Sequence, residues 1–185
     1  MKPIILASAS PRRQEICTLL GLTFTVIPAQ NETEVDPTLP VEQAIVQVAR
    51  GKAEEVAAIH PDTFVLGADT TVIVDGEVLG KPHDAKEAKA MLRHLSGRTH
   101  QVVTGVWLSK NGGGDGFADV ADVVFGEMTE AEIEEYVNSG EPMDKAGAYG
   151  IQGCGMRYID GIRGDFYTVM GLPAGRLYRF LKEWL

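Results

Sequence analysis

The sequence predicts an α/β protein, because strand-like and helix-like segments alternate along its 185 residues. Two short, nearly continuous apolar runs, "PIILAS" and "TFVLGAD", are suited to buried strands. Between them, over residues 40–59, apolar residues recur at helical spacing, at Val41, Ala44, Ile45, Val48 and Val56. The length and the hydrophobic content of 44% fit a globular chain, and we expect residues 1–185 to form a single domain.

The first helix has a clear start and a clear end in the sequence. Ser10 is a good N-cap, Pro11 suits the first helical position, and Gly21 follows the last apolar residues of the segment. The alternating segment "LTFTVIP" after it predicts a second strand.

Two hairpins are predicted farther along the chain. Asp75-Gly76 is a favoured two-residue turn, and it lies within the strand-like segment "TTVIVDGEVLG". Residues 100–110 and 118–126 flank "NGGGDG", which predicts a long hairpin with a flexible tip.

Three more helices follow from capping signals and periodicity. Asp84 with Glu87, and Thr129 with Glu132, have the spacing of a capping box. Residues 173–185 then predict a C-terminal helix.

The composition excludes several classes of function. A net charge of −9 and a pI near 4.9 disfavour nucleic acid as a partner, whereas a small anion needs only a local positive pocket. Because no apolar run is long enough for a membrane span or a signal peptide, we expect neither a membrane partner nor export. Cys17 and Cys154 are far apart and lack metal-ligand spacing, which fits free thiols in the cytoplasm.

Two adjacent arginines at a helix start raise the first question of function. The N-terminus of a helix carries partial positive charge, so a cation there is disfavoured by about 0.3–1 kcal/mol unless an anion lies beside it. Arg12 and Arg13 are therefore either solvated surface residues or part of an anion site. This stretch alone does not decide between the two.

Lys52 and Asp69 also depart from the local pattern. Lys52 lies on the apolar face of its predicted helix, either extending from the edge of the stripe to solvent or aimed into a cleft. Asp69 ends a buried apolar run, where a carboxylate is costly unless it is paired, binds a metal or faces a cleft. Ligands of α/β sheets sit at such carboxyl ends, which favours a functional Asp69.

Three weaker candidates lie in loops. Lys81 stands between a glycine and a proline in "LGKPHD", and Glu32 lies in the acidic loop "NETEVD". Gln152 lies in the glycine-rich "DKAGAYGIQGCG", whose backbone either approaches a ligand closely or forms a turn between strands. Basic side chains, carboxylates and glycines at the ends of elements are what phosphoryl chemistry requires. Neither a Walker A motif nor GxGxxG is present.

Several of these segments together resemble one known family. "LASASPRRQEIC", "VLGADTTVIVDGEVLGKP", "LSGRTHQVVTGV" and "GEPMDKAGAYGIQG" are similar to the motifs of the Maf family of nucleotide pyrophosphatases, in the same order over almost the whole chain. The resemblance implies an elongated mixed sheet with flanking helices, in two lobes around a cleft, a fold shared with the inosine-triphosphate pyrophosphatases. It also implies a divalent metal cation, Mg²⁺ or Mn²⁺, and members are often homodimers.

The resemblance assigns a role to each candidate residue. Asp69 corresponds to the general base that activates water, and Glu32 with Asp69 to the metal ligands. Three positions, Arg12, Thr70 and Gln152, correspond to those that distinguish substrates. The residues that line the substrate are Ser8, Arg12, Arg13, Lys52, Lys81 and Gln152.

The implied reaction is hydrolysis of a nucleoside triphosphate to the monophosphate and diphosphate. Thr70 directly after Asp69 is similar to the branch that acts on dTTP and UTP, whereas the branch acting on 7-methyl-GTP has glutamine there. Two alternatives stay open: a pyrophosphatase for a modified purine nucleotide, and a nucleotide-binding regulator of cell division. A regulator needs no positioned base, so Asp69 favours the enzyme.

Overall fold

The computed structural model describes residues 2–31 and 35–185, which fall into two compact units. The first unit contains the described residues of Met1–Thr70, together with Thr104–Asp119 and Gly171–Leu185. The second contains Thr71–Val103 and Val120–Met170. Parallel and antiparallel strand pairs occur in one sheet, so the predicted α/β class with a mixed sheet is confirmed. The strands pair in the order Phe24–Val26, Ile4–Leu6, Phe64–Val74, Thr99–Lys110, Gly113–Phe125 and Ile159–Arg163, and Glu77–Leu79 pairs with Phe64–Val74.

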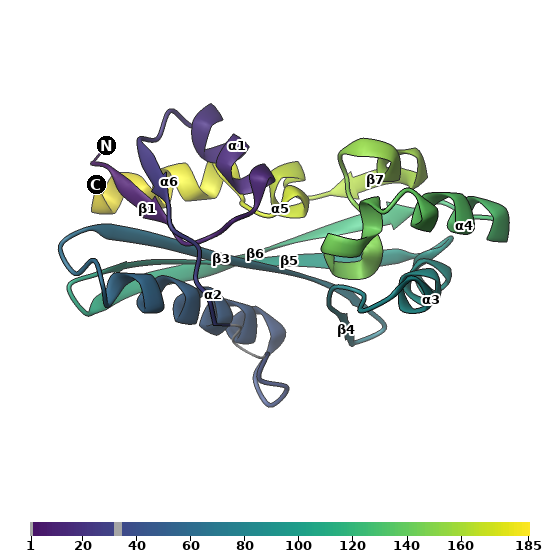
Figure 1. Ribbon diagram of the computed structural model, residues 1–185, viewed down its shortest axis with the longest axis horizontal. Helices are drawn as coiled ribbons and strands as arrows, with labels where there is room; N and C mark the ends of the chain where they lie inside the picture. Colours follow the sequence, from purple (N-terminus) through teal and green to yellow (C-terminus); the bar gives the residue numbers. More distant parts are fainter. Residues whose placement is uncertain (1, 32–34) are drawn as a thin grey trace. The chain divides into compact units, whose positions relative to one another are not determined.

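The elements follow the chain as Figure 1 labels them. The first unit alone holds β1 (Ile4–Leu6), α1 (Pro11–Leu19), β2 (Phe24–Val26), α2 (Val41–Ala57) and α6 (Ala174–Trp184). Residues of both units form β3 (Phe64–Val74), β5 (Thr99–Lys110) and β6 (Gly113–Phe125). The second unit alone holds β4 (Glu77–Leu79), α3 (Ala85–Leu95), α4 (Glu130–Asn138), η1 (Glu141–Asp144), η2 (Ala146–Ala148), η3 (Gly153–Tyr158), β7 (Ile159–Arg163) and α5 (Phe166–Met170).

Strand β1 is parallel to both β2 and β3 and is much shorter than β3. Leu6, its last residue, pairs with Leu66, and Ala7 N–H donates to the Leu66 carbonyl at 2.8 Å. The chain then leaves the sheet and enters α1 at Pro11, as predicted. Ser10 occupies the N-cap position, but its side chain makes no capping hydrogen bond. The segment after β1 therefore lies beside the middle of β3.

Helix α2 packs unusually close to the strands of the first unit. A Cβ at Gly67 in β3 would lie 2.2 Å from the Ala49 carbonyl oxygen, and one at Gly105 in β5 would lie 2.6 Å from the Ile45 backbone. Because neither residue has a side chain, the backbone of α2 can approach β3 and β5 this closely. In Figure 1, α1 and α6 lie on the opposite side of the strands from α2. Of the predicted α2 stripe, Val41 alone is partly exposed.

The hairpin predictions are confirmed, with one difference in extent. Asp75 and Gly76 both adopt positive φ between β3 and β4, as a two-residue turn requires. The second hairpin turns over Asn111-Gly112 only, and β6 begins at the next residue. A Cβ at Gly114 would lie 2.6 Å from Trp107 Nε1, so part of the expected tip is strand packed on an indole.

Helices α3 and α4 of the second unit begin at the predicted caps. Thr129 and Glu132 form a complete capping box, whereas the Asp84 carboxylate accepts from Glu87 N–H at 2.8 Å without the reciprocal bond. Glu87 accepts instead from His83 N–H at 2.6 Å, one residue earlier. Strand β7, helix α5 and the three 3₁₀ segments were not predicted, because such short elements carry too few residues for a periodic signal.

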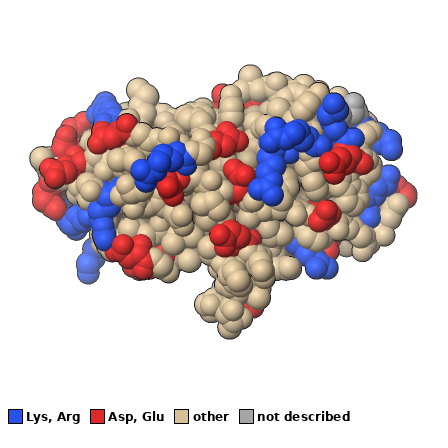
Figure 2. Space-filling view, turned by 180° about the vertical axis from the view of Figure 1, so that it is seen from behind, with Lys and Arg blue, Asp and Glu red and all other residues tan. Residues whose placement is uncertain are grey.

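Two properties of the surface bear on possible partners. On the face shown in Figure 2, acidic side chains lie among the basic ones. Within the described ranges, no helix is long and apolar enough to cross a membrane.

A buried histidine in the second unit has an unusual environment. His100 Nε2 lies 2.6 Å from the Tyr149 hydroxyl, and the imidazole packs near the Phe125 ring. His100 Nδ1 has no hydrogen-bond partner among the described residues. Burial lowers the pKa of His100 from 6.5 to about 4, so the folded protein holds it neutral.

We expect this histidine to destabilise the fold in acid. Its pKa is lower in the folded protein than in the unfolded chain, so protonation favours the unfolded chain. The free energy of unfolding is therefore undiminished above pH 6.5 and falls by about 3 kcal/mol as the pH drops toward 4. In His100→Gln, the free energy of unfolding should therefore fall less steeply between pH 6.5 and 4 than in the wild type. Exposed His83 provides the control, His83→Gln, which should keep the wild-type slope. An unchanged slope in His100→Gln would contradict the assignment.

The packing of α2 gives a second prediction. Gly67→Ala should lower the free energy of unfolding by about 1–3 kcal/mol, because the new Cβ meets a backbone oxygen that moves only with the helix. Urea titration followed by circular dichroism measures this. Gly113→Ala is the matched control, since its Cβ would lie 3.8 Å from the Lys110 carbonyl oxygen. If Gly67→Ala and Gly113→Ala had equal free energies of unfolding, the packing of α2 on β3 would not depend on a glycine at position 67.

Candidate active site

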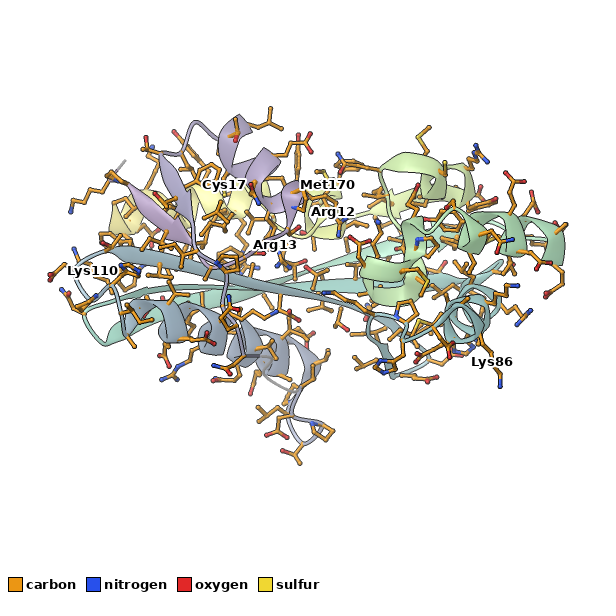
Figure 3. All side chains as sticks on the ribbon, in the orientation of Figure 1. Arg12, Arg13, Cys17, Lys86, Lys110 and Met170 are labelled. Carbon is orange, nitrogen blue, oxygen red and sulfur yellow. The ribbon has the colours of Figure 1, made fainter. Side chains whose placement is uncertain are left out.

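Arg13 connects three segments of the first unit. Its Nη1 donates to Ser8 Oγ at 3.0 Å, its Nη2 to Thr70 Oγ1 at 3.0 Å, and its Nε to the Gly171 carbonyl at 2.8 Å. These partners come from the segment after β1, from β3 and from the residue after α5. Figure 3 shows Arg13 between α1 and the strands. The guanidinium thus fixes Ser8 and Thr70 relative to each other.

The three oxygens to which Arg13 donates are neutral, so direct contact does not balance its charge. Arg13 makes no ion pair within residues 2–31 and 35–185. Burial lowers its pKa, and the nearby Asp69 carboxylate acts in the opposite direction. A half-buried guanidinium without a directly bound carboxylate favours an anionic ligand beside it. Arg13 is thus bonded within the protein, and its role in an anion site stays a prediction.

Thr104 is a residue that the sequence did not single out. Its hydroxyl lies 2.9 Å from Thr70 Oγ1, and Thr104 is fully buried in β5. Thr70 is therefore held from one side by Arg13 and from the other by Thr104. Threonine is common in strands, so nothing in "QVVTGVWL" distinguished this position.

Asp69 forms an ion pair with Lys52 through Oδ1 and Nζ. The two side chains are 21% and 24% exposed, so water reaches both. The close approach of α2 to Gly67, two residues before Asp69, explains why a lysine of that helix reaches the carboxylate. Lys52 is thus directed at Asp69 rather than along the helix to solvent.

The position of Asp69 differs from the expectation in one respect. It does not end its strand, since β3 continues from Phe64 to Val74 without a break. The strand that ends here is the neighbour, β1, whose last residue pairs with Leu66. The carboxyl end of a parallel strand therefore does lie near Asp69, but it belongs to the adjacent strand.

Arg12 has a different environment from Arg13. It is partly exposed and makes no hydrogen bond or ion pair to the part of the chain that the structure describes. Figure 3 shows the two arginines at separate positions near α1. Arg12 can therefore contact a ligand without first losing a protein partner.

Lys81 and Gln152 belong to the second unit. Lys81 is exposed, and its neighbour Gly80 accepts from Gly147 N–H at 3.0 Å, which joins the "LGKP" and "DKAG" segments. Gln152 lines a pocket of about 660 Å³. The other lining residues are mostly apolar: Ile151, Gly153, Met156, Ile159, Gly161, Ile162 and Phe166. The roles of Lys81 and Gln152 toward substrate stay predictions.

The predicted metal ligands are described only in part, because Glu32 lies outside the described residues. Asn31, directly before it, donates its N–H to Glu55 of α2 at 3.1 Å. Within the described ranges, no three His, Cys, Asp or Glu residues group as metal ligands. Asp69 alone still fits Mg²⁺, which in proteins is often held by one or two carboxylates together with substrate phosphates and water.

The fold and the contacts define an α/β protein in which Arg13 bonds to Thr70, the residue directly after the Asp69 carboxylate that pairs with Lys52. The chain belongs to the family described as Maf-like protein, whose model matches residues 3–184.

Relatives of similar length support this assignment. The chain is 47% identical over 183 residues to a protein of Bacillus velezensis named dTTP/UTP pyrophosphatase, covering 99% of this chain and 97% of the relative. It is 49% identical over 180 residues to an Aquifex aeolicus protein of the same name, covering 97% and 94%. A Halalkalibacterium halodurans protein of that name is 46% identical, with coverage of 98% and 96%.

A solved structure has the same fold. The Ham1 protein of Staphylococcus aureus matches with a TM-score of 0.53 at 15% identity, over 98% of this chain and 99% of that one. At this identity the likeness concerns the fold alone.

The contacts of Arg13 give a prediction about stability. Arg13→Lys should lower the free energy of unfolding by about 1–3 kcal/mol, because one ammonium cannot reach the three acceptors that the guanidinium joins. Chemical denaturation measures the difference. The neighbouring variant Arg12→Lys should stay within about 0.5 kcal/mol of the wild type. If both variants lose the same stability, the Arg13 contacts do not hold the segments together.

Proposed function

We propose that the protein is a nucleoside triphosphate pyrophosphatase that hydrolyses dTTP and UTP to the monophosphate and diphosphate. The observation that carries this is a water-accessible Asp69 in β3 that is paired with Lys52 of α2, while Thr70, the next residue of β3, bonds to the Arg13 guanidinium. The names of relatives at 46–49% identity agree with it. We propose that residues 1–185 act as one domain.

Asp69 acts as the general base in this proposal. It accepts a proton from a water molecule, whose oxygen attacks the α-phosphorus while the bond from that phosphorus to the bridging oxygen breaks and diphosphate leaves. Lys52 fixes the carboxylate through its bond to Oδ1. A base held in one position is effective because it need not reorganise during the reaction.

The basic residues bind the triphosphate. Arg13 has five N–H groups, and its three contacts to neutral oxygens leave two for phosphate. We propose that Ser8, Arg12 and Lys81 contact the phosphates as well. Each such donor stabilises the negative charge that develops on the phosphate oxygens in the transition state.

We propose that Asp69 and Glu32 hold a divalent cation, Mg²⁺ or Mn²⁺. When bound, the cation supplies charge neutralisation at the phosphates. Asp69 then has two functions, as metal ligand and as base, which its two oxygens allow.

The preference for pyrimidines is proposed to depend on Arg12, Thr70 and Gln152. The Gln152 amide, which both donates and accepts, lines an apolar pocket in the second unit. An apolar wall with one amide fits a flat base whose edge has both a hydrogen-bond donor and an acceptor, as the imide of thymine and uracil does. We propose the cytoplasm as the site of action, and a homodimer as the assembly.

Product analysis tests the proposed reaction. With dTTP and Mg²⁺, the purified protein should release diphosphate and dTMP in equal amounts. Orthophosphate as the product would mean attack at the terminal phosphate and would exclude this mechanism. Faster hydrolysis of 7-methyl-GTP or ITP than of dTTP would assign the enzyme to modified purines. Tight nucleotide binding without any product would indicate a regulator.

The role of Asp69 is tested by one isosteric substitution. Asp69→Asn should lower kcat for dTTP by at least about 100-fold, because general-base catalysis contributes on the order of 10²–10⁴. Its circular dichroism spectrum should match the wild type. Exposed Asp62 gives the control, Asp62→Asn, which should retain full activity. Near-normal turnover in Asp69→Asn removes Asp69 from this role.

A further inference from the structure

Glu141 in the second unit has more hydrogen-bond partners than an ordinary surface glutamate. Its Oε1 accepts from the Tyr136 hydroxyl at 2.9 Å and from Gly155 N–H at 3.0 Å, and its Oε2 accepts from Cys154 N–H at 2.8 Å. The carboxylate of η1 is thus bonded to α4 and to the start of η3. No phosphate-binding or catalytic role proposed above uses it.

The Tyr136 hydroxyl extends these contacts to the other side of Gln152. It accepts from Gly150 N–H at 3.1 Å, and the tyrosine is 3% exposed. Gly150 precedes Gln152 by two residues, and Cys154 follows it by two. Glu141 and Tyr136 together therefore hold the backbone on both sides of Gln152, and we name Glu141, Tyr136, Gly150, Cys154 and Gly155 the Glu141 cluster.

The glycines of this segment are explained by the same cluster. A Cβ at Gly153 would lie 2.7 Å from Glu141 Oε2, and a Cβ at Gly155 would lie 2.5 Å from the Tyr136 hydroxyl. Gly153 also has a φ of +78°, which favours glycine. These glycines allow the close approach of protein side chains, and no ligand is needed to explain them.

The charge of Glu141 suits this arrangement. Burial alone would raise the pKa of Glu141, but the Cys154 and Gly155 amides, the Tyr136 hydroxyl and the Lys145 charge together hold it below its usual range. The Lys145 ammonium is bonded nearby, to the Glu141 carbonyl at 2.6 Å. An ionised carboxylate is an acceptor only, which matches three donors around it.

Gln152, the residue between the fixed amides, lines the apolar pocket of the second unit. An amide discriminates between bases only if its oxygen and nitrogen are held at defined positions. We infer that Glu141, together with Tyr136, is a positioning residue that sets the place of Gln152 for contact with a pyrimidine base. This rests on the proposed function.

The test compares dTTP with dCTP, whose base presents a different pattern of donors and acceptors. Glu141→Gln keeps the size of the side chain, but its amide nitrogen cannot accept from an N–H, so at least one contact of the cluster is lost. We expect the ratio of kcat/KM for dTTP to that for dCTP to fall by about tenfold, the equivalent of one hydrogen bond. The loss should appear in KM for dTTP, with kcat within about twofold.

A double-mutant cycle distinguishes positioning from general loss of structure. In a Gln152→Ala background, Glu141→Gln should change the dTTP-to-dCTP ratio by less than about twofold, because the group that it positions is absent. Tyr136→Phe is a second variant, for use if Glu141→Gln does not fold. It should also lower the dTTP-to-dCTP ratio. The matched control is Glu134→Gln on the exposed side of α4, which should keep the wild-type ratio.

The possible outcomes separate the two proposals. A wild-type enzyme that releases no diphosphate from dTTP overturns the proposed function. A wild-type enzyme that prefers dTTP, with folded variants that keep the wild-type ratio, overturns the positioning role alone. The positioning role is also overturned if Glu141→Gln changes the dTTP-to-dCTP ratio equally in the wild type and in the Gln152→Ala background.

Discussion

The candidate site of the first unit depends on the hydrogen bonds that the Arg13 guanidinium donates to three neutral oxygens. Arg13 bonds to Ser8, Thr70 and the Gly171 carbonyl, so one side chain holds three segments that are far apart in the sequence. None of these partners cancels its charge. The same residue can therefore serve the fold and retain an attraction for phosphate, because an arginine has more donors than these contacts use.

Close packing of a helix on glycines sets the second part of the site. Because Gly67 and Gly105 carry no side chains, α2 approaches β3 and β5 closely, and Lys52 reaches Asp69 from the helix. An ion pair that is partly exposed adds little stability by itself. In the proposed mechanism, the ion pair holds the Asp69 carboxylate at one position while water still reaches it, as a general base requires.

The glycine-rich segment of the second unit illustrates how a motif can have two explanations. From the sequence, its glycines suited either a ligand or a turn. In the structure they admit the Glu141 carboxylate and the Tyr136 hydroxyl, and these two groups bind the backbone amides around Gln152. Side chains of α4 and η1 thus hold the segment, and its contribution to specificity is proposed to follow from these contacts.

Much of the fold could be predicted from local patterns. The α/β class, the starts of α1, α3 and α4, and the Asp75-Gly76 turn depend on periodicity, caps and turn residues that lie close together in the sequence. Short elements such as β7 and α5 were missed, since a few residues carry no periodic signal. The candidates Arg13, Lys52 and Asp69 were identified because each was costly or unusual in its predicted element.

The sequence by itself determined which residue types were available for phosphate chemistry and on which elements they lie. Only the tertiary structure decided that Lys52 pairs with Asp69, that Thr104 contacts Thr70, and that Glu141 accepts from the Cys154 and Gly155 amides. The physical reason is that these contacts join elements that are separate in the chain. Their geometry depends on strand register and on how closely a helix approaches a sheet, and neither is encoded by a local pattern.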